Sequence, residues 1–69
     1  MSGFGNWLAR FTQVTGPIGD LARDVAADAD WPQEPDDLET YTDHLEAAGA
    51  SPAALEALAE AWGRYAARQ

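Results

Sequence analysis

The chain has 69 residues, no cysteine, and 12 acidic residues against four basic ones, which give a formal net charge of -8. This length predicts one domain over residues 1–69 with a small core, and the lack of cysteine excludes disulfides and thiolate metal sites. The charge disfavours direct contact with nucleic-acid phosphates or anionic lipids. No apolar stretch approaches the roughly 20 residues that span a membrane, and the first residues lack the pattern of a secretory signal, so we expect a cytoplasmic protein.

The first predicted element is a helix over residues 4–12. Its large apolar residues recur at spacings of three and four, which places them along one side of a helix. They are Phe4, Trp7, Leu8 and Phe11. We therefore expect this helix to present an aromatic stripe to the core.

A second helix is predicted to begin at Pro17, because proline suits the first helical position, with Thr15 or Gly16 as its cap. Pro32 is expected to end it, since the residue before a proline avoids the α-helical conformation. Gly19 lies in the first turn, where the missing side chain lets another helix or an aromatic ring approach closely. The buried face is predicted to comprise Ile18, Leu21, Ala22 and Val25, continued by Ala26 and Ala29.

The segment WPQEPDD, residues 31–37, contains two prolines and three acids and predicts an ordered corner. Trp31 is too large to remain in water without a reason, so we expect it to fold back onto the core. We also expect Trp7, Trp31 and Trp62 to share one core, because a chain this short depends on every large side chain for burial.

A third helix is predicted to begin after Asp36 or Asp37, either of which can cap it, and to run to Ala48. Gly49 follows where a left-handed cap ends a helix. Its expected buried face carries Leu38, Tyr41 and Leu45.

A fourth helix is predicted from Pro52, with Ser51 as its N-cap, to about Tyr65. Its apolar residues at helical spacing are Leu55, Leu58, Ala59, Trp62 and Tyr65. No alternation typical of a strand occurs, so the fold class predicted is all-α, a compact four-helix bundle.

Several segments resemble the YozE family of small bacterial proteins. They are FGNWLARF, PIGDLARDVAADADWP and LETYTDHLEAAGASPAALEALAEAW, followed by Tyr65, and together they span Phe4 to Tyr65. The resemblance implies a four-helix fold similar to the sterile alpha motif, a SAM-like fold. It implies no catalytic residues, and the comparison with SAM-like domains suggests binding of a protein or a nucleic acid.

The acids of the second predicted helix do not form a metal motif. Asp20, Asp24 and Asp28 are four residues apart, which places their oxygens along a ridge, whereas calcium loops gather closely spaced ligands around a point. Arg23 can pair with Asp20 three residues earlier. We therefore expect a solvated face, with no metal and no cofactor.

The sequence also offers no set of residues for nucleophilic catalysis. His44 stands beside Asp43, and adjacent helical residues do not face each other. The serines are Ser2, near the start of the chain, and Ser51, a predicted cap, so neither has an activating base. We therefore predict that the protein is not an enzyme.

The function predicted is a small binding module that recognises an unknown protein partner with a basic surface, as a monomer or a weak homo-oligomer. The candidate surface comprises Glu34, Asp36 and Asp37 at the corner with Glu56 and Glu60 on the fourth helix. In the fourth helix, Glu60 precedes Arg64 by four residues, which is the favourable order for an ion pair along a helix. The alternative is a role with nucleic acids, either by direct contact through Arg64 and Arg68 or by an acidic surface that imitates DNA.

Overall fold

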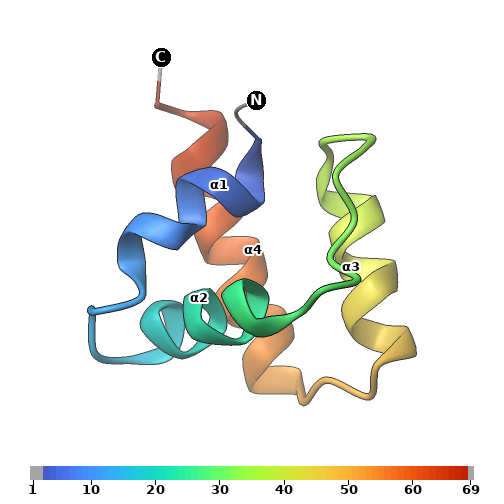
Figure 1. The fold of residues 1–69 in the computed structure, drawn as a ribbon, viewed down its shortest axis with the longest axis horizontal. Helices are drawn as coiled ribbons and strands as arrows, with labels where there is room; N and C mark the ends of the chain where they lie inside the picture. The colour runs from blue at the N-terminus through green and yellow to red at the C-terminus, as the bar shows by residue number, and fades with distance from the viewer. Residues whose placement is uncertain (1–2, 69) are drawn as a thin grey trace.

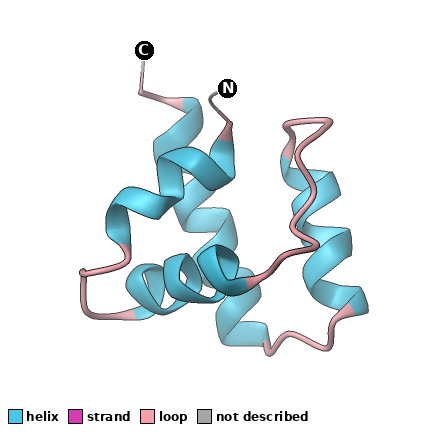
Figure 2. Ribbon diagram, viewed as in Figure 1, coloured by secondary structure: helices cyan, strands magenta, loops and turns pink. Residues whose placement is uncertain are grey.

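The computed structural model describes residues 3–68. Over this range the chain is helical and contains no strand, as Figure 2 shows, so the predicted all-α class is confirmed. The elements are α1 (Phe4–Leu8), a 3₁₀ turn η1 (Ala9–Phe11), α2 (Pro17–Ala27), α3 (Leu38–Ala47) and α4 (Pro52–Ala66). The radius of gyration is 10.8 Å, against about 11 Å expected for a compact chain of this length.

Helix α4 is the central element, because α1, α2 and α3 all pack against it. In Figure 1, α1 and α2 lie on one side of α4 and α3 lies on the other, with the two ends of the described chain near each other. Helices α2 and α3 do not pack against each other along their lengths. Trp31, in the corner that follows α2, stacks on Tyr41 of α3.

The core is built around the ring of Phe4, which is fully buried in α1. Its centroid lies 5.1 to 5.9 Å from those of Trp7, Tyr41, Trp62 and Tyr65. Rings at these separations attract each other beyond the burial of their area. The predicted stripe of the first helix is confirmed, since Leu8 is also buried and Phe11 packs against the core.

The three tryptophans join one cluster, as predicted, but to different degrees. Trp31 is buried, with 6% of its surface exposed, and it stacks on Tyr41 at 5.1 Å. Trp7 and Trp62 are partly buried at the edge of the cluster. The prediction that Trp31 folds back onto the core is therefore confirmed.

The end of the second helix differs from the prediction. Helix α2 ends at Ala27, whereas Pro32 was expected to end it, and Ala29 is not helical. Asp28 takes an extended conformation, and its carboxylate accepts the backbone N–H of Asp30 at 2.9 Å. Because the helix ends early, the chain can turn back and bury Trp31 in the core. Tertiary packing, and not Pro32, therefore sets the end of α2.

The remaining caps agree with the sequence. Asp37 caps α3 by accepting the Thr40 N–H at 2.9 Å, and Ser51 caps α4 by accepting the Ala54 N–H at 3.2 Å. Gly49 has a φ of 82°, the left-handed conformation predicted for it. Around this glycine the backbone closes a Schellman motif, in which the Ala50 N–H reaches the Leu45 carbonyl at 2.9 Å.

Gly19 is required by a close backbone approach. A Cβ at this position would lie 1.6 Å from the carbonyl oxygen of Val14, in the connection that precedes α2. Arg23 also holds that connection, because its Nη1 donates to the carbonyls of Thr12 at 2.9 Å and Val14 at 3.1 Å. The predicted packing role is confirmed, although the neighbour is a backbone carbonyl and not a helix or a ring.

We expect Gly19→Ala to lower the free energy of unfolding by about 2–3 kcal/mol, because the methyl group would displace the Val14 carbonyl and strain the connection. Gly63→Ala is the matched control, since a Cβ there meets nothing within 4 Å and alanine favours the helix by up to about 1 kcal/mol. Urea unfolding of the two variants measures both changes. Equal stability of the two variants would show that the Val14 carbonyl is not held against Gly19.

Candidate functional site: a groove along α2

Two adjoining pockets form a groove beside α2, and we call them together the α2 groove. Their volumes are about 320 Å³ and 220 Å³, and Asp24 lines both of them. The first volume falls within the usual range for binding pockets and the second just below it. The groove follows α2 from its start to the corner at Trp31.

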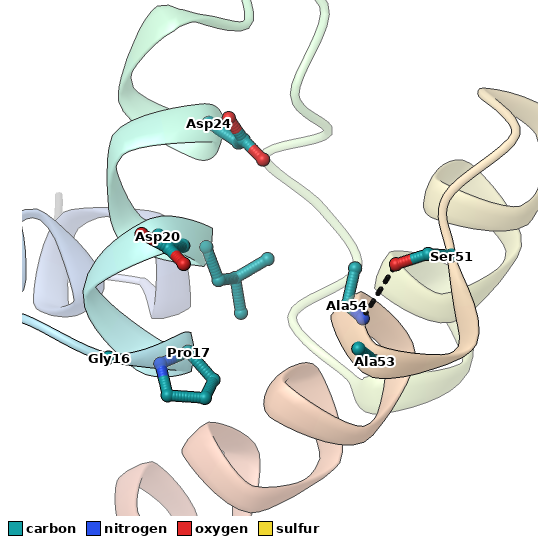
Figure 3. A pocket seen from close by; sticks show the side chains of 8 residues that line it. Gly16, Pro17, Asp20, Asp24, Ser51, Ala53 and Ala54 are labelled. Carbon is teal, nitrogen blue, oxygen red and sulfur yellow. Dashed lines mark hydrogen bonds between the residues drawn. The ribbon is translucent and has the colours of Figure 1, made fainter.

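The larger pocket lies between the first turns of α2 and α4. Figure 3 shows Asp20 and Asp24 on the α2 side, with Ser51, Ala53 and Ala54 facing them across the pocket. The α4 wall is low, because alanine side chains reach only one carbon from the backbone. The space is therefore a consequence of small residues in the first turn of α4.

The smaller pocket lies between the end of α2 and the turn that joins α3 to α4. Val25 and Trp31 line one side, and Leu45, Ala48 and Ala50 line the other. The Schellman motif brings Ala50 back beside Leu45 and so builds this wall. The groove exists because α2 and α3 pack against α4 but not against each other.

The three aspartates along the groove differ in their partners. Asp20 forms an exposed ion pair with Arg23, as predicted. Asp28 accepts a hydrogen bond from the Nε2–H of His44 at 2.7 Å, and this bond, together with the Asp30 N–H, lowers the pKa of the Asp28 carboxyl. Within residues 3–68, Asp24 has neither an ion pair nor a hydrogen bond to its side chain, so its charge faces the groove without compensation.

His44 pairs across the fold and not along its own helix. Its ring also meets that of Trp31 edge-on, with centroids 5.3 Å apart. The expectation that Asp43 would not pair with it agrees with the structure, but the bond to Asp28 could not be anticipated from spacing, because it joins residues 16 positions apart. Among the described residues, no three histidine or acidic side chains gather in a way that could hold a metal ion.

The predicted acidic surface is placed apart from the groove. None of its members, Glu34, Asp36, Asp37, Glu56 and Glu60, lines either pocket of the α2 groove. Asp37 serves as the cap of α3, and Glu60 pairs with Arg64 at 3.1 Å, which confirms the predicted helical pair. Glu34 stands in the corner, before a cis peptide bond to Pro35.

Asp36 has an internal role that the sequence did not reveal. Its Oδ1 accepts the backbone N–H of Phe4 at 3.0 Å and the hydroxyl of Tyr41, and its Oδ2 accepts the hydroxyl of Tyr65. One carboxylate thus joins the start of α1 to α3 and α4. As a member of the predicted partner surface it is a poor choice, because three hydrogen bonds already occupy its oxygens.

These bonds also set the ionisation of the three side chains. Burial by itself would raise the pKa of Asp36, but the two hydroxyls and the Phe4 N–H stabilise the carboxylate more, so its pKa lies below the ordinary value of 3.8. Burial, followed by the bond to Asp36, raises the pKa of Tyr41, and the bond to Asp36 is the main reason that the pKa of Tyr65 is raised.

The two arginines of the nucleic-acid alternative are both engaged within the chain. Arg64 pairs with Glu60, and Arg68 donates to the carbonyl of Tyr65 at 2.7 Å while its guanidinium lies 3.9 Å from the centre of that ring. Arg68 and Arg10 also line a separate pocket of about 190 Å³. None of the described helices is both long enough and apolar enough to cross a membrane.

Comparison with known proteins finds one family. The model of the YozE SAM-like fold family matches residues 3–67, which is nearly the whole chain. No curated protein matches the chain, and no solved structure matches it.

We expect Asp36→Asn to lower the free energy of unfolding by about 1–2 kcal/mol at pH 7, because the amide offers one acceptor oxygen where the carboxylate offers two, and part of the site is open to water. Asp37→Asn is the control, since asparagine caps a helix about as well as aspartate does. Chemical unfolding measures both variants. A loss at Asp37 as large as that at Asp36 would contradict the internal role of Asp36.

The effect of Asp36→Asn is expected to depend on pH. The folded-state pKa of Asp36 is lowered, so its contribution to stability is present above the ordinary value of 3.8 and is lost as the pH falls through the folded-state value. Asparagine does not titrate. The stability difference between the natural protein and Asp36→Asn should therefore shrink below about pH 4, and a difference that stays constant or grows there would contradict this explanation.

Proposed function

The chain belongs to the YozE SAM-like fold family, and we propose that it is a non-enzymatic binding module whose α2 groove receives a basic segment of a partner protein. The observation that carries the proposal is the composition of the groove. One wall bears the uncompensated carboxylate of Asp24, with Asp20 and Asp28 four residues away on either side. The other wall consists mostly of alanines, together with Ser51 and Leu45.

A groove of this kind combines two sources of affinity. Burial of its apolar wall by a partner is favourable, and its carboxylates attract cations and repel acidic or phosphate-rich molecules. The net charge of -8 extends this preference to the rest of the surface and favours the approach of a basic partner. A lysine- or arginine-rich protein segment with apolar residues on one side fits both walls.

The arrangement of potential catalytic groups supports a binding role. The hydroxyl of Ser51 is used to cap α4, and His44 is held between the Asp28 carboxylate and the Trp31 ring. No hydrogen bond joins the two side chains among the described residues, so the groove lacks a base directed at a nucleophile. Recognition without chemistry is therefore the function that the groove supports best.

The nucleic-acid alternative has less support. Direct binding needs cations that can face phosphates, and both Arg64 and Arg68 are held by their own chain. An acidic surface that imitates DNA would not depend on the α2 groove in particular. Binding of a basic segment therefore depends on the groove residues, whereas imitation of DNA depends on the acidic surface as a whole.

A photo-crosslinking experiment tests the proposed function. The amino acid p-benzoylphenylalanine replaces either Ala53 at the groove or, as a control, Glu56 on α4 outside the groove. Both sites are exposed, so both variants should fold. In extracts of native-host cells we expect position 53 to capture a protein through a basic segment. The crosslinking yield should fall in high salt and in the Asp24→Asn variant, and it should not change in Glu56→Gln.

The outcomes of this experiment discriminate between the hypotheses. Mass spectrometry of the crosslinked peptide identifies the partner segment and its charge. Capture from position 56 alone, or capture unaffected by Asp24→Asn, would place binding outside the α2 groove. Capture of only DNA-binding proteins at both positions equally would favour imitation of DNA.

A further inference from the structure

The form of the bound segment can be inferred from the groove, and this inference rests on the proposed function. Over residues 3–68 the protein has no strand, and hence no sheet edge to which an extended peptide could add. Beyond their first turns, α2 and α4 bond their backbone groups within their own helices, and in the first turn of α4 the Ala54 N–H is taken by Ser51. An extended segment would leave its own backbone groups without partners against the apolar wall.

A helix meets these conditions, because it satisfies its backbone hydrogen bonds internally and presents only side chains. The alanines along the groove, Ala48, Ala50, Ala53 and Ala54, project little from their backbone. Small residues of this kind let a second helix approach to the short end of the usual interaxial distance of 8–10 Å. The groove therefore suits a helix better than a strand.

The dimensions of the groove fix the length and the charge spacing of such a helix. Its wall on α2 runs from Gly16 to Asp28, and at 1.5 Å per residue this corresponds to about 18 Å, or roughly three helical turns. Asp20 and Asp24 are one turn apart on the α2 side, as Figure 3 shows, and Asp28 follows at the same sequence spacing. Cations repeated every four residues on a neighbouring helix match that spacing of about 6 Å.

We propose that the α2 groove binds an amphipathic helix of about three turns, which carries arginine or lysine every four residues beside an apolar stripe. The apolar stripe covers the alanine wall, Ala48, Ala50, Ala53 and Ala54, while the cations face the aspartates. Charge complementarity is strongest at Asp24, because Asp20 is paired with Arg23 and Asp28 is hydrogen-bonded to His44, whereas the Asp24 carboxylate has neither kind of partner among the described residues. A partner segment of this class is recognised by its pattern and not by a particular sequence.

Three synthetic peptides of one composition test the inference, each about 18 residues or five helical turns long, which is three turns for the groove and one more at each end. The first places arginines every four residues beside a leucine and alanine stripe. The second has the same residues with arginine and leucine alternating, as in a strand. The first peptide also has a proline at each end. In the third peptide these two prolines exchange places with two central residues, which prevents a helix there. Titration followed by nuclear magnetic resonance measures the affinities and locates the contacts.

We expect the first peptide to bind about tenfold more tightly than the other two, with shifts at Asp24, Leu21 and Ala53. Asp24→Asn should weaken it about fivefold and Glu56→Gln should leave it unchanged. Equal affinity of the three peptides, still sensitive to Asp24→Asn, would overturn the helical form and leave the proposed function standing. Absence of binding of the first peptide at about 1 mM would also overturn the helical form. If all three peptides bind and Asp24→Asn does not weaken them, both the helical form and the proposed function are contradicted.

Discussion

The fold depends on the Asp36 carboxylate, which binds three parts of the chain at one point. It accepts the backbone N–H of Phe4 and the hydroxyls of Tyr41 and Tyr65, so α1, α3 and α4 are fixed relative to one another. Hydrogen bonds to a charged acceptor are stronger than those between neutral groups. Here the donors are the backbone of Phe4 and two tyrosines whose rings pack against the buried ring of Phe4. In a chain with a small apolar core, such a polar junction supplies orientation that packing alone does not.

The α2 groove adjoins the corner that carries Asp36, because Trp31 of that corner lines it. Asp36 joins α3 to the start of α1 and to the end of α4, and Trp31 stacks on Tyr41 of α3. Helix α3 packs against α4 and not against α2, which leaves the groove open. Asp36 thus helps to organise the fold, whereas Asp20, Asp24 and Asp28 line the groove.

Local features were predictable from the sequence, whereas features that join distant segments were not. The caps at Ser51 and Gly49 depend on a few consecutive residues, and both were predicted correctly. The end of α2 was predicted wrongly, because Asp28 is drawn out of the helix by the Asp30 N–H and by His44, and no rule about a nearby proline includes that bond. The role of Asp36 was missed for the same reason, since its donors lie 5 to 32 positions away.

The candidate site shows the same division. Sequence spacing identified the ridge of aspartates on α2, and it identified the small residues near Ser51 as part of a helix, but it could not place the two opposite each other. The predicted partner surface followed net charge and favoured the corner, where Asp36 and Asp37 are used by the fold. The groove became visible only once the separation of α2 from α3 was known.

Titration of the Asp36 carboxyl carbon by nuclear magnetic resonance tests the central claim most directly. If Asp36 is the junction of the fold, its midpoint lies below 3.8, and the ring signals of Tyr41 and Tyr65 change at the same pH. A midpoint at or above 3.8, with neither tyrosine responding, would show that the carboxylate faces water and that another interaction holds the helices together.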